Sequence, residues 1–204
     1  MKKFVRNIAF VAALSVGMVT AHAWAPGQMV IPEDTYYWIQ STDRMNYYVE
    51  WKKIVYAVNE DGTLDFGKLT VPIIKSYDGI QVKDVIERRR WNNLSTEGFD
   101  HLAGENGILE VDLLEKTVTL KKVSYLNYSL KVIEEMEPKQ SVEILKLPEK
   151  HVERRFYEGI IAFENSNSET IIKNTRSKLT NDELKQLVKE RKKTQKEIEK
   201  KYKK

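Results

Sequence analysis

Hydrophobic positions along residues 35–41 and 47–54 are rich in aromatic and β-branched residues. Such residues favour strands, and the Ser-Thr-Asp turn residues at 41–43 lie between the two segments. The pattern therefore predicts an amino-terminal hairpin. A further strand is predicted over residues 69–76, where Pro72 favours an edge position or a bulge.

The period changes after this strand. Apolar side chains recur every three or four residues along 81–92, which predicts a short helix. Three arginines at 88–90 complement the dipole at its carboxyl end. Gly98, Gly104 and Gly107 then predict a loop.

Three segments with alternating character follow, at residues 108–114, 117–125 and 130–136. Short polar turns at 115–116 and 127–129 separate them. This arrangement predicts a meander of three antiparallel strands.

The carboxyl-terminal third is expected to be helical. Pro148 suits the first turn of a helix over residues 149–163, which carries apolar residues on one face. Polar residues at 165–169 then predict a linker over 165–180.

A last helix is predicted over residues 181–204, because Thr180 and Glu183 have the spacing of a capping box. Its apolar residues are too sparse for a self-burying stripe: Leu184, Leu187, Val188, Ile198 and Tyr202. We therefore expect residues 24–164 to fold without this tail.

The first 23 residues have the three parts of a signal peptide. Lys2, Lys3 and Arg6 precede an apolar run at 8–19, and Ala21-His22-Ala23 offers a small-x-small cleavage site. The run is too short to span a bilayer. We expect export to the periplasm or cell surface, with cleavage after Ala23. The chain has no cysteine, so it has no disulfide.

These segments together predict an α+β fold. Residues 24–164 would form one domain, in which a curved antiparallel sheet of five or six strands carries the helix over 149–163. A linker at 165–180 and a basic helical tail at 181–204 would follow.

The net charge of +4 is unevenly distributed. Residues 181–204 hold ten Lys/Arg against five Asp/Glu, whereas the body is mildly acidic. Such a tail would attract anionic lipid headgroups, acidic polysaccharide or an acidic partner. The alternative is a solvated helix that only aids solubility, and nucleic acid is not an expected partner. The expected contacts are Lys189, Arg191, Lys192, Lys193, Lys196 and Lys200.

The amino-terminal strands carry the densest group of aromatic residues. Alternate residues of a strand face opposite sides, so some of these rings are candidates for an exposed recognition surface. The alternative is that they all lie in the core or under helices and loops. The candidate residues are Tyr36, Trp38, Tyr48 and Trp51.

Catalytic and cofactor motifs are missing from the sequence. Only His101 and His151 follow the signal peptide, and there is no His-Glu-x-x-His helix, no Gly-x-Ser-x-Gly elbow and no glycine-rich phosphate loop. We therefore expect no metal, no cofactor and no enzymatic activity.

Several short segments resemble the surface-adhesin E-like group of small exported bacterial proteins. The matching stretches are Tyr37-Trp38-Ile39-Gln40-Ser41-Thr42-Asp43, Tyr47-Tyr48-Val49-Glu50, Leu109-Glu110-Val111-Asp112, Val123-Ser124-Tyr125 and the helix at 152–160. The resemblance covers about residues 33–163. It implies a curved antiparallel sheet with a packed helix and an exported binding protein.

The expected function is accordingly that of an exported, non-catalytic, adhesin-like protein of the bacterial envelope or surface that binds a macromolecular partner. The alternative is a periplasmic structural or assembly factor whose basic tail docks on anionic membrane or on a partner complex.

Overall fold

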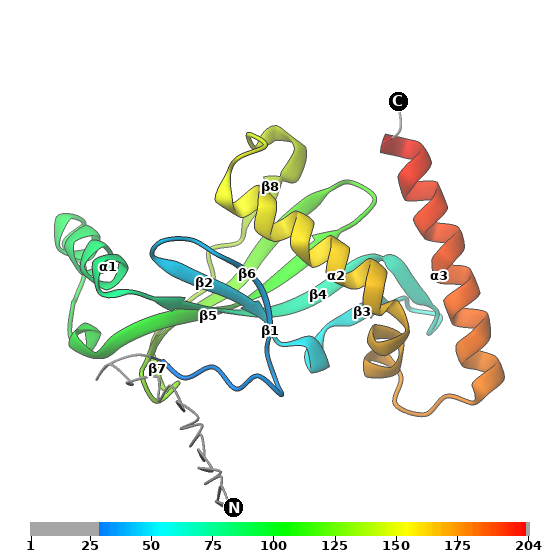
Figure 1. Cartoon of the computed structure of the whole chain (residues 1–204), viewed down its shortest axis with the longest axis horizontal. Coiled ribbons are helices and arrows are strands. Elements are labelled where there is room, and N and C mark those ends of the chain that lie inside the picture. The colour runs from blue at the N-terminus through cyan, green and yellow to red at the C-terminus, as the bar shows by residue number, and fades with distance from the viewer. Residues whose placement is uncertain (1–28, 203–204) are drawn as a thin grey trace, which may run out of the picture.

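The computed structural model describes residues 29–202, so the predicted signal peptide and its cleavage site lie outside the described residues. The described chain forms one eight-stranded antiparallel sheet with three α-helices (Figure 1). The predicted α+β class is confirmed, with more strands than the five or six expected. None of the helices within residues 29–202 combines the length and apolar character needed to cross a membrane.

The sheet is organised around β4, a 14-residue strand that pairs with β5 on one side and with both β2 and β3 on the other. The order is β1-β2-β4-β5-β6-β7, and β8 pairs with β6 beyond the end of β7. The strands are β1 (Tyr37–Ser41), β2 (Met45–Val49), β3 (Val55–Val58), β4 (Leu64–Tyr77), β5 (Leu102–Asp112), β6 (Thr117–Asn127), β7 (Val132–Met136) and β8 (Gln140–Glu143). The predicted hairpin and meander are both present.

Pro72 lies within this central strand instead of at an edge, and the structure shows why it is tolerated. The Glu50 N–H donates to the Pro72 carbonyl, so Pro72 turns its backbone toward β2. There the short helix η1 (Trp51–Lys53) separates β2 from β3. The backbone of Pro72 therefore faces the gap between β2 and β3. No strand is present there to accept the hydrogen bond that proline cannot donate.

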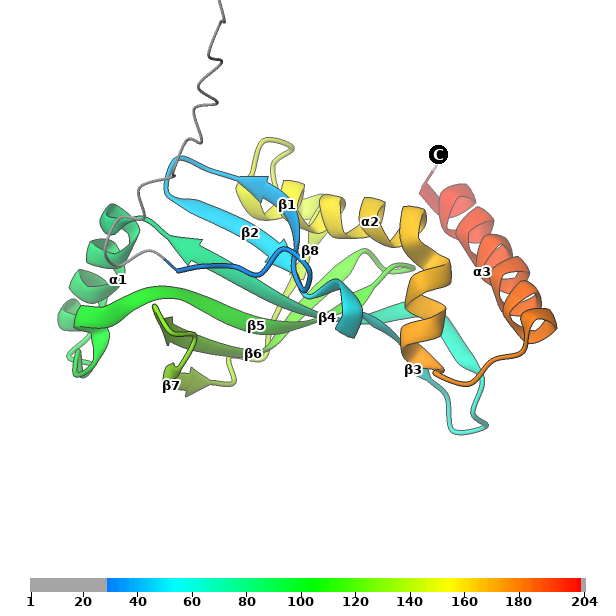
Figure 2. The same cartoon turned by 60° about the horizontal axis from the view of Figure 1, so that its bottom comes forward.

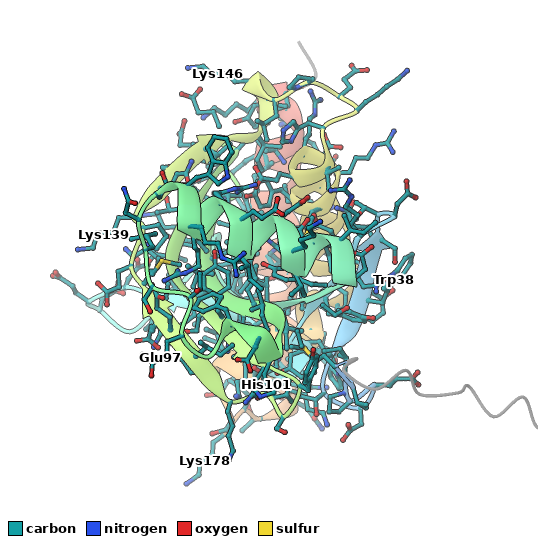
Figure 3. The ribbon with its side chains drawn as sticks, turned by 90° about the vertical axis from the view of Figure 1, so that its left-hand side faces the viewer. Trp38, Glu97, His101, Lys139, Lys146 and Lys178 are labelled. Atoms are coloured by element: carbon teal, nitrogen blue, oxygen red, sulfur yellow. The ribbon has the colours of Figure 1, made fainter. Side chains whose placement is uncertain are left out.

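Both outer edges of the sheet are irregular. The register of β1 against β2 shifts between Trp38 and Gln40, which leaves Ile39 in a bulge. At the opposite edge, β7 and β8 are separated by Pro138 and by Lys139, whose φ is 47°. Trp38 and Lys139 accordingly lie at opposite margins of the molecule (Figure 3).

The prediction of a loop around the glycines was wrong for Gly104 and Gly107, which lie inside β5. A side chain at Gly104 would overlap the carbonyl oxygen of Lys75 on β4. These glycines thus permit close pairing of the strands and do not interrupt them.

Three helices lie around the sheet: α1 (Gly79–Trp91), α2 (Val152–Thr175) and α3 (Asn181–Tyr202). Helix α1 begins at Asp78, whose side chain accepts a hydrogen bond of 2.7 Å from the Gln81 N–H, and it packs at one end of the sheet (Figure 1). Helix α2 crosses one face, and α3 packs beside it at the other end. Short helices η2 (Phe99–His101) and η3 (Ile144–Lys146) complete the fold.

The predicted linker over 165–180 is mostly helix, because α2 continues to Thr175. Its polar residues mark a kink at Asn167, whose φ and ψ are −123° and 19°. Beyond the kink, Ile171 and Ile172 are completely buried in the main core. The polar segment therefore redirects the helix without ending its contact with the body.

The last helix is also part of the body. Thr180 and Glu183 form the predicted capping box, but the sparse apolar stripe packs against the main core. Ile198 is buried there, and Leu184, Leu187, Val188 and Tyr202 pack against it. The expectation that this stripe buries little is corrected: α3 packs on the body along one narrow line of apolar residues.

The main core lies between the sheet and helices α2 and α3. Figure 2 shows no described α-helix on the opposite side of the sheet. That side is covered only in part, by residues that lead into β1: Met29 and Tyr36 pack with Tyr48 and Ile74. Among residues 29–202, no other segment covers the remainder of this face (Figure 2).

Candidate binding surface

Three aromatic residues of the predicted recognition surface meet on the open side of the sheet. Tyr36, Trp38 and Tyr48 line one hollow of about 400 Å³, which we call the aromatic hollow. Trp38 and Tyr48 are opposite each other on β1 and β2, and Trp38 is 53% exposed. The other lining residues are Ile31, Glu33 and Tyr37.

Strand alternation produces this arrangement. The ring of Tyr37, between Tyr36 and Trp38, packs 4.7 Å from that of Phe163 on α2. Its neighbours therefore face the opposite side. The indole N–H of Trp38 donates to the Ser41 hydroxyl at 2.9 Å, which holds the ring in place.

Trp51 does not belong to this surface, and its assignment is corrected. It lies in η1 and packs against the main core. Its carbonyl oxygen accepts a hydrogen bond of 2.9 Å from Asn174 on α2. The strand predicted to run to residue 54 ends at Val49, so alternation does not extend to Trp51.

A second hollow of about 330 Å³ continues from Tyr36 across the sheet. Glu50 and Lys53 form an ion pair of 2.7 Å on its β2 side. Lys122 and Glu135 form another of 2.7 Å on its β7 side. The lining between them includes Pro72, Asn106, Ile108 and Ser124. We call this hollow the central groove.

The electrostatics of the two hollows are close to neutral. Burial, and secondarily Glu50, raises the pKa of Tyr36, and burial followed by Glu33 does the same for Tyr48. Both phenols therefore remain protonated at neutral pH and can donate hydrogen bonds. A hydrogen bond from Lys122 lowers the pKa of Glu135, which stays charged and paired.

Sequence reasoning missed the central groove because its two ion pairs are far apart from each other in the chain. Lys122 and Glu135 meet through the register that pairs Ser124 with Glu135. Glu50 and Lys53 meet because η1 turns the chain after β2. The only sequence signal was the meander itself. Its pattern predicts the strands but not which residue of one strand pairs with which residue of the next.

The predicted anionic-partner contacts on α3 divide into two groups. Lys189, Lys192, Lys193, Lys196 and Lys200 are exposed, as expected. Arg191 is only 2% exposed, so its assignment is corrected: it faces the body and pairs with Glu164 of α2. Over residues 181–202, seven exposed lysines accompany five exposed acidic residues, so the positive excess is small.

A metal site would need several His, Asp or Glu side chains close together in the described part of the chain. It contains no group of three or more His, Asp or Glu side chains able to hold a metal ion. His101 is exposed and lies 3.3 Å from the Asp100 carboxylate. His151 accepts a hydrogen bond from the Glu153 N–H at the start of α2, which is a capping role.

Comparisons of the chain with models of protein families, with curated proteins and with solved structures find no match. The resemblance to the surface-adhesin E-like group therefore stays a prediction.

Proposed function

We propose that the protein is an exported, non-catalytic binding protein of the bacterial envelope or surface, and that it recognises a protein partner through the open face of its sheet. The observation that carries this proposal is the aromatic hollow. Three residues expected to form a recognition surface line one concavity there, next to a groove that no described helix covers.

The composition of this face favours a protein partner. Binding energy at protein interfaces is concentrated in Tyr, Trp and Arg residues, which sit in partly enclosed pockets surrounded by a polar rim. Tyr36, Trp38 and Tyr48 supply the aromatic centre. The paired charges beside the central groove supply a rim that needs no counter-charge from the partner.

The test uses the chain without its predicted signal peptide, with a photoreactive benzoylphenylalanine at position 38 or at position 91. Trp91 is the matched control, because it is 87% exposed but lies on α1. We expect a protein from envelope extract to cross-link at position 38 and not at position 91.

The affinity of the cross-linked protein, once purified, decides the proposal. Trp38→Ala and Tyr48→Ala should each weaken binding about tenfold or more, and Trp91→Ala should leave it unchanged. Equal cross-linking at both positions, or unchanged affinity of both variants, would show that the open face is not the binding surface.

The alternative, an envelope assembly factor whose basic tail docks on anionic membrane, is supported by the exposed lysines of α3. Its test is sedimentation with vesicles that contain phosphatidylglycerol. Changing Lys192, Lys193, Lys196 and Lys200 to glutamine should abolish binding at low salt, as high salt should in the parent. Equal binding by parent and variant would exclude a role for the tail charge.

A further inference from the structure

A separate cavity of about 190 Å³ lies where α3 closes over the body. It is bounded by the turn between β5 and β6, by α2 and by α3. Its lining includes the apolar side chains of Leu113, Ile161 and Ile198 and the aromatic residue Tyr202. The Tyr202 hydroxyl donates to the Leu114 carbonyl at 2.5 Å, which fixes the end of α3 against the turn.

Arg191 lines this cavity and has unused hydrogen-bonding capacity. Its Nε donates to Glu164 at 2.5 Å, and its Nη2 donates to Glu164 and to Asn165. Nη1 is buried and has no acceptor among the described residues. A buried charged donor without an acceptor destabilises the folded protein, so the Nη1 group is expected to have an acceptor that the described residues do not supply.

A second cation, Lys116, lines the same cavity from the β5–β6 turn. Its Nζ lies 5.3 Å from the centre of the Tyr202 ring, and burial lowers its pKa. Within residues 29–202 Lys116 forms no ion pair: the Glu164 carboxylate is engaged by Arg191 and by the Tyr56 hydroxyl, and Glu158 is paired with Arg154. The cavity thus combines one unpaired ammonium with one free guanidinium donor.

We propose that this cavity binds a small organic monoanion, a short-chain carboxylate. Its carboxylate would lie toward Lys116 and Arg191, and its hydrocarbon part would pack against Leu113, Ile161 and Ile198. A single negative charge would lie between the Lys116 ammonium and the Arg191 Nη1 donor, which has no acceptor among the described residues. Glu164 and Glu199 also line the cavity, so its four charged side chains sum to zero, and a dianion such as sulfate would be repelled more strongly than a monoanion.

This site is independent of the proposed partner surface. The cavity lies against α2 and α3, whereas the aromatic hollow lies on the side of the sheet without described helices. Ligand bound there would bridge α3 to the body, because Lys116 belongs to the sheet and Arg191 to α3. Binding to the folded protein only would raise its thermal stability.

The probe is sodium butanoate, compared with neutral butanamide and with sodium chloride at equal ionic strength. We expect a saturable rise of the transition temperature with butanoate alone. Amide chemical shifts around Gln195 should move in parallel, and those around Trp38 should not. This second measurement locates the ligand in the unaltered protein.

Two variants test the two parts of the site. Lys116→Met removes the ammonium and keeps an unbranched apolar side chain, and should weaken butanoate binding by about tenfold or more. Ile161→Phe fills the cavity while both cations remain, and should also abolish the shift. Lys192→Met removes an exposed lysine of the same helix and should change nothing.

The proposal fails if chloride or butanamide reproduces the effect of butanoate. It also fails if butanoate gives no saturable response, which would mean that water alone satisfies Arg191. Unchanged binding by both Lys116→Met and Ile161→Phe would likewise exclude this cavity as the site.

Discussion

Arg191 of α3 donates two hydrogen bonds to Glu164 of α2, and the two side chains are 2% and 1% exposed. The Tyr56 hydroxyl of β3 donates to the same carboxylate. Three elements separated in the sequence are therefore joined at one buried charge. Because water is excluded, the carboxylate depends on these donors for its stability.

Loss of this ion pair should be costly. Arg191→Met leaves Glu164 buried with the Tyr56 hydroxyl as its remaining donor, and we expect the free energy of unfolding in urea to fall by about 3–5 kcal/mol. Lys192→Met, at the exposed neighbour, should change it by no more than about 0.5 kcal/mol. The double variant Arg191→Met with Glu164→Met should recover much of the loss, since no charge is then left unpaired.

Removal of residues 165–204 should unfold the protein. Residues 24–164 lack Ile171, Ile172 and Ile198 of the main core and also lack the counter-charge of Glu164. We expect this fragment to show no cooperative thermal transition and to bind a dye specific for exposed apolar surface. A transition like that of the longer chain would show that α3 contributes little to stability.

Alkaline pH should destabilise the protein through its buried tyrosines. Burial, and then Glu153, raises the pKa of Tyr157 from an ordinary value of 10.0 to about 12. Between these values the unfolded chain loses a proton that the folded protein keeps. The stabilising contribution is thus complete below pH 10 and is lost as the pH rises to 12.

Between pH 10 and pH 12, each buried tyrosine whose pKa is raised in this way lowers the free energy of unfolding by about 1.4 kcal/mol per pH unit. Urea unfolding at several pH values gives the slope of the free energy of unfolding against pH. Tyr157→Phe should make this slope less steep by the contribution of one tyrosine. An unchanged slope would mean that Tyr157 is more open to water than its 8% exposure indicates.

Two glycines allow a matched comparison of packing. Gly104→Ala places a methyl group against the Lys75 carbonyl oxygen of the neighbouring strand, and should destabilise the protein by about 1–3 kcal/mol. Gly79→Ala, at the start of α1, meets no atom within 4 Å, and should be neutral or slightly stabilising. Equal thermal shifts for the two variants would contradict the tight pairing of β4 and β5.

Local patterns predicted most of the elements correctly. The amino-terminal hairpin, the helix near residues 81–92 and the meander depend on neighbouring residues, whose periodicity is visible in the sequence. The capping box at Thr180 and Glu183 is local in the same sense: the Thr180 N–H donates to the Glu183 carboxylate, and the Glu183 N–H donates to the Thr180 hydroxyl.

The wrong expectations concern contacts between distant residues. Arg191 looked like one of many exposed cations, because Glu164 is 27 positions away on another helix. The polar residues near Asn167 looked like a linker, because nothing local shows that Ile171 and Ile172 return to the core. Trp51 is not part of the aromatic surface because it lies in η1, which follows the end of the strand.

The irregular edges of the sheet bear on self-association. A regular outer strand would offer its free N–H and C=O groups to another copy, which is a common route to aggregation. Here the bulge at Ile39 breaks the hydrogen-bonding repeat of β1, and Gln40 beside it is held by the Val152 carbonyl of α2 at 2.9 Å. Pro138 divides the opposite edge into two short strands. These irregularities leave neither edge of the sheet with a continuous row of free backbone groups for a second copy to pair with.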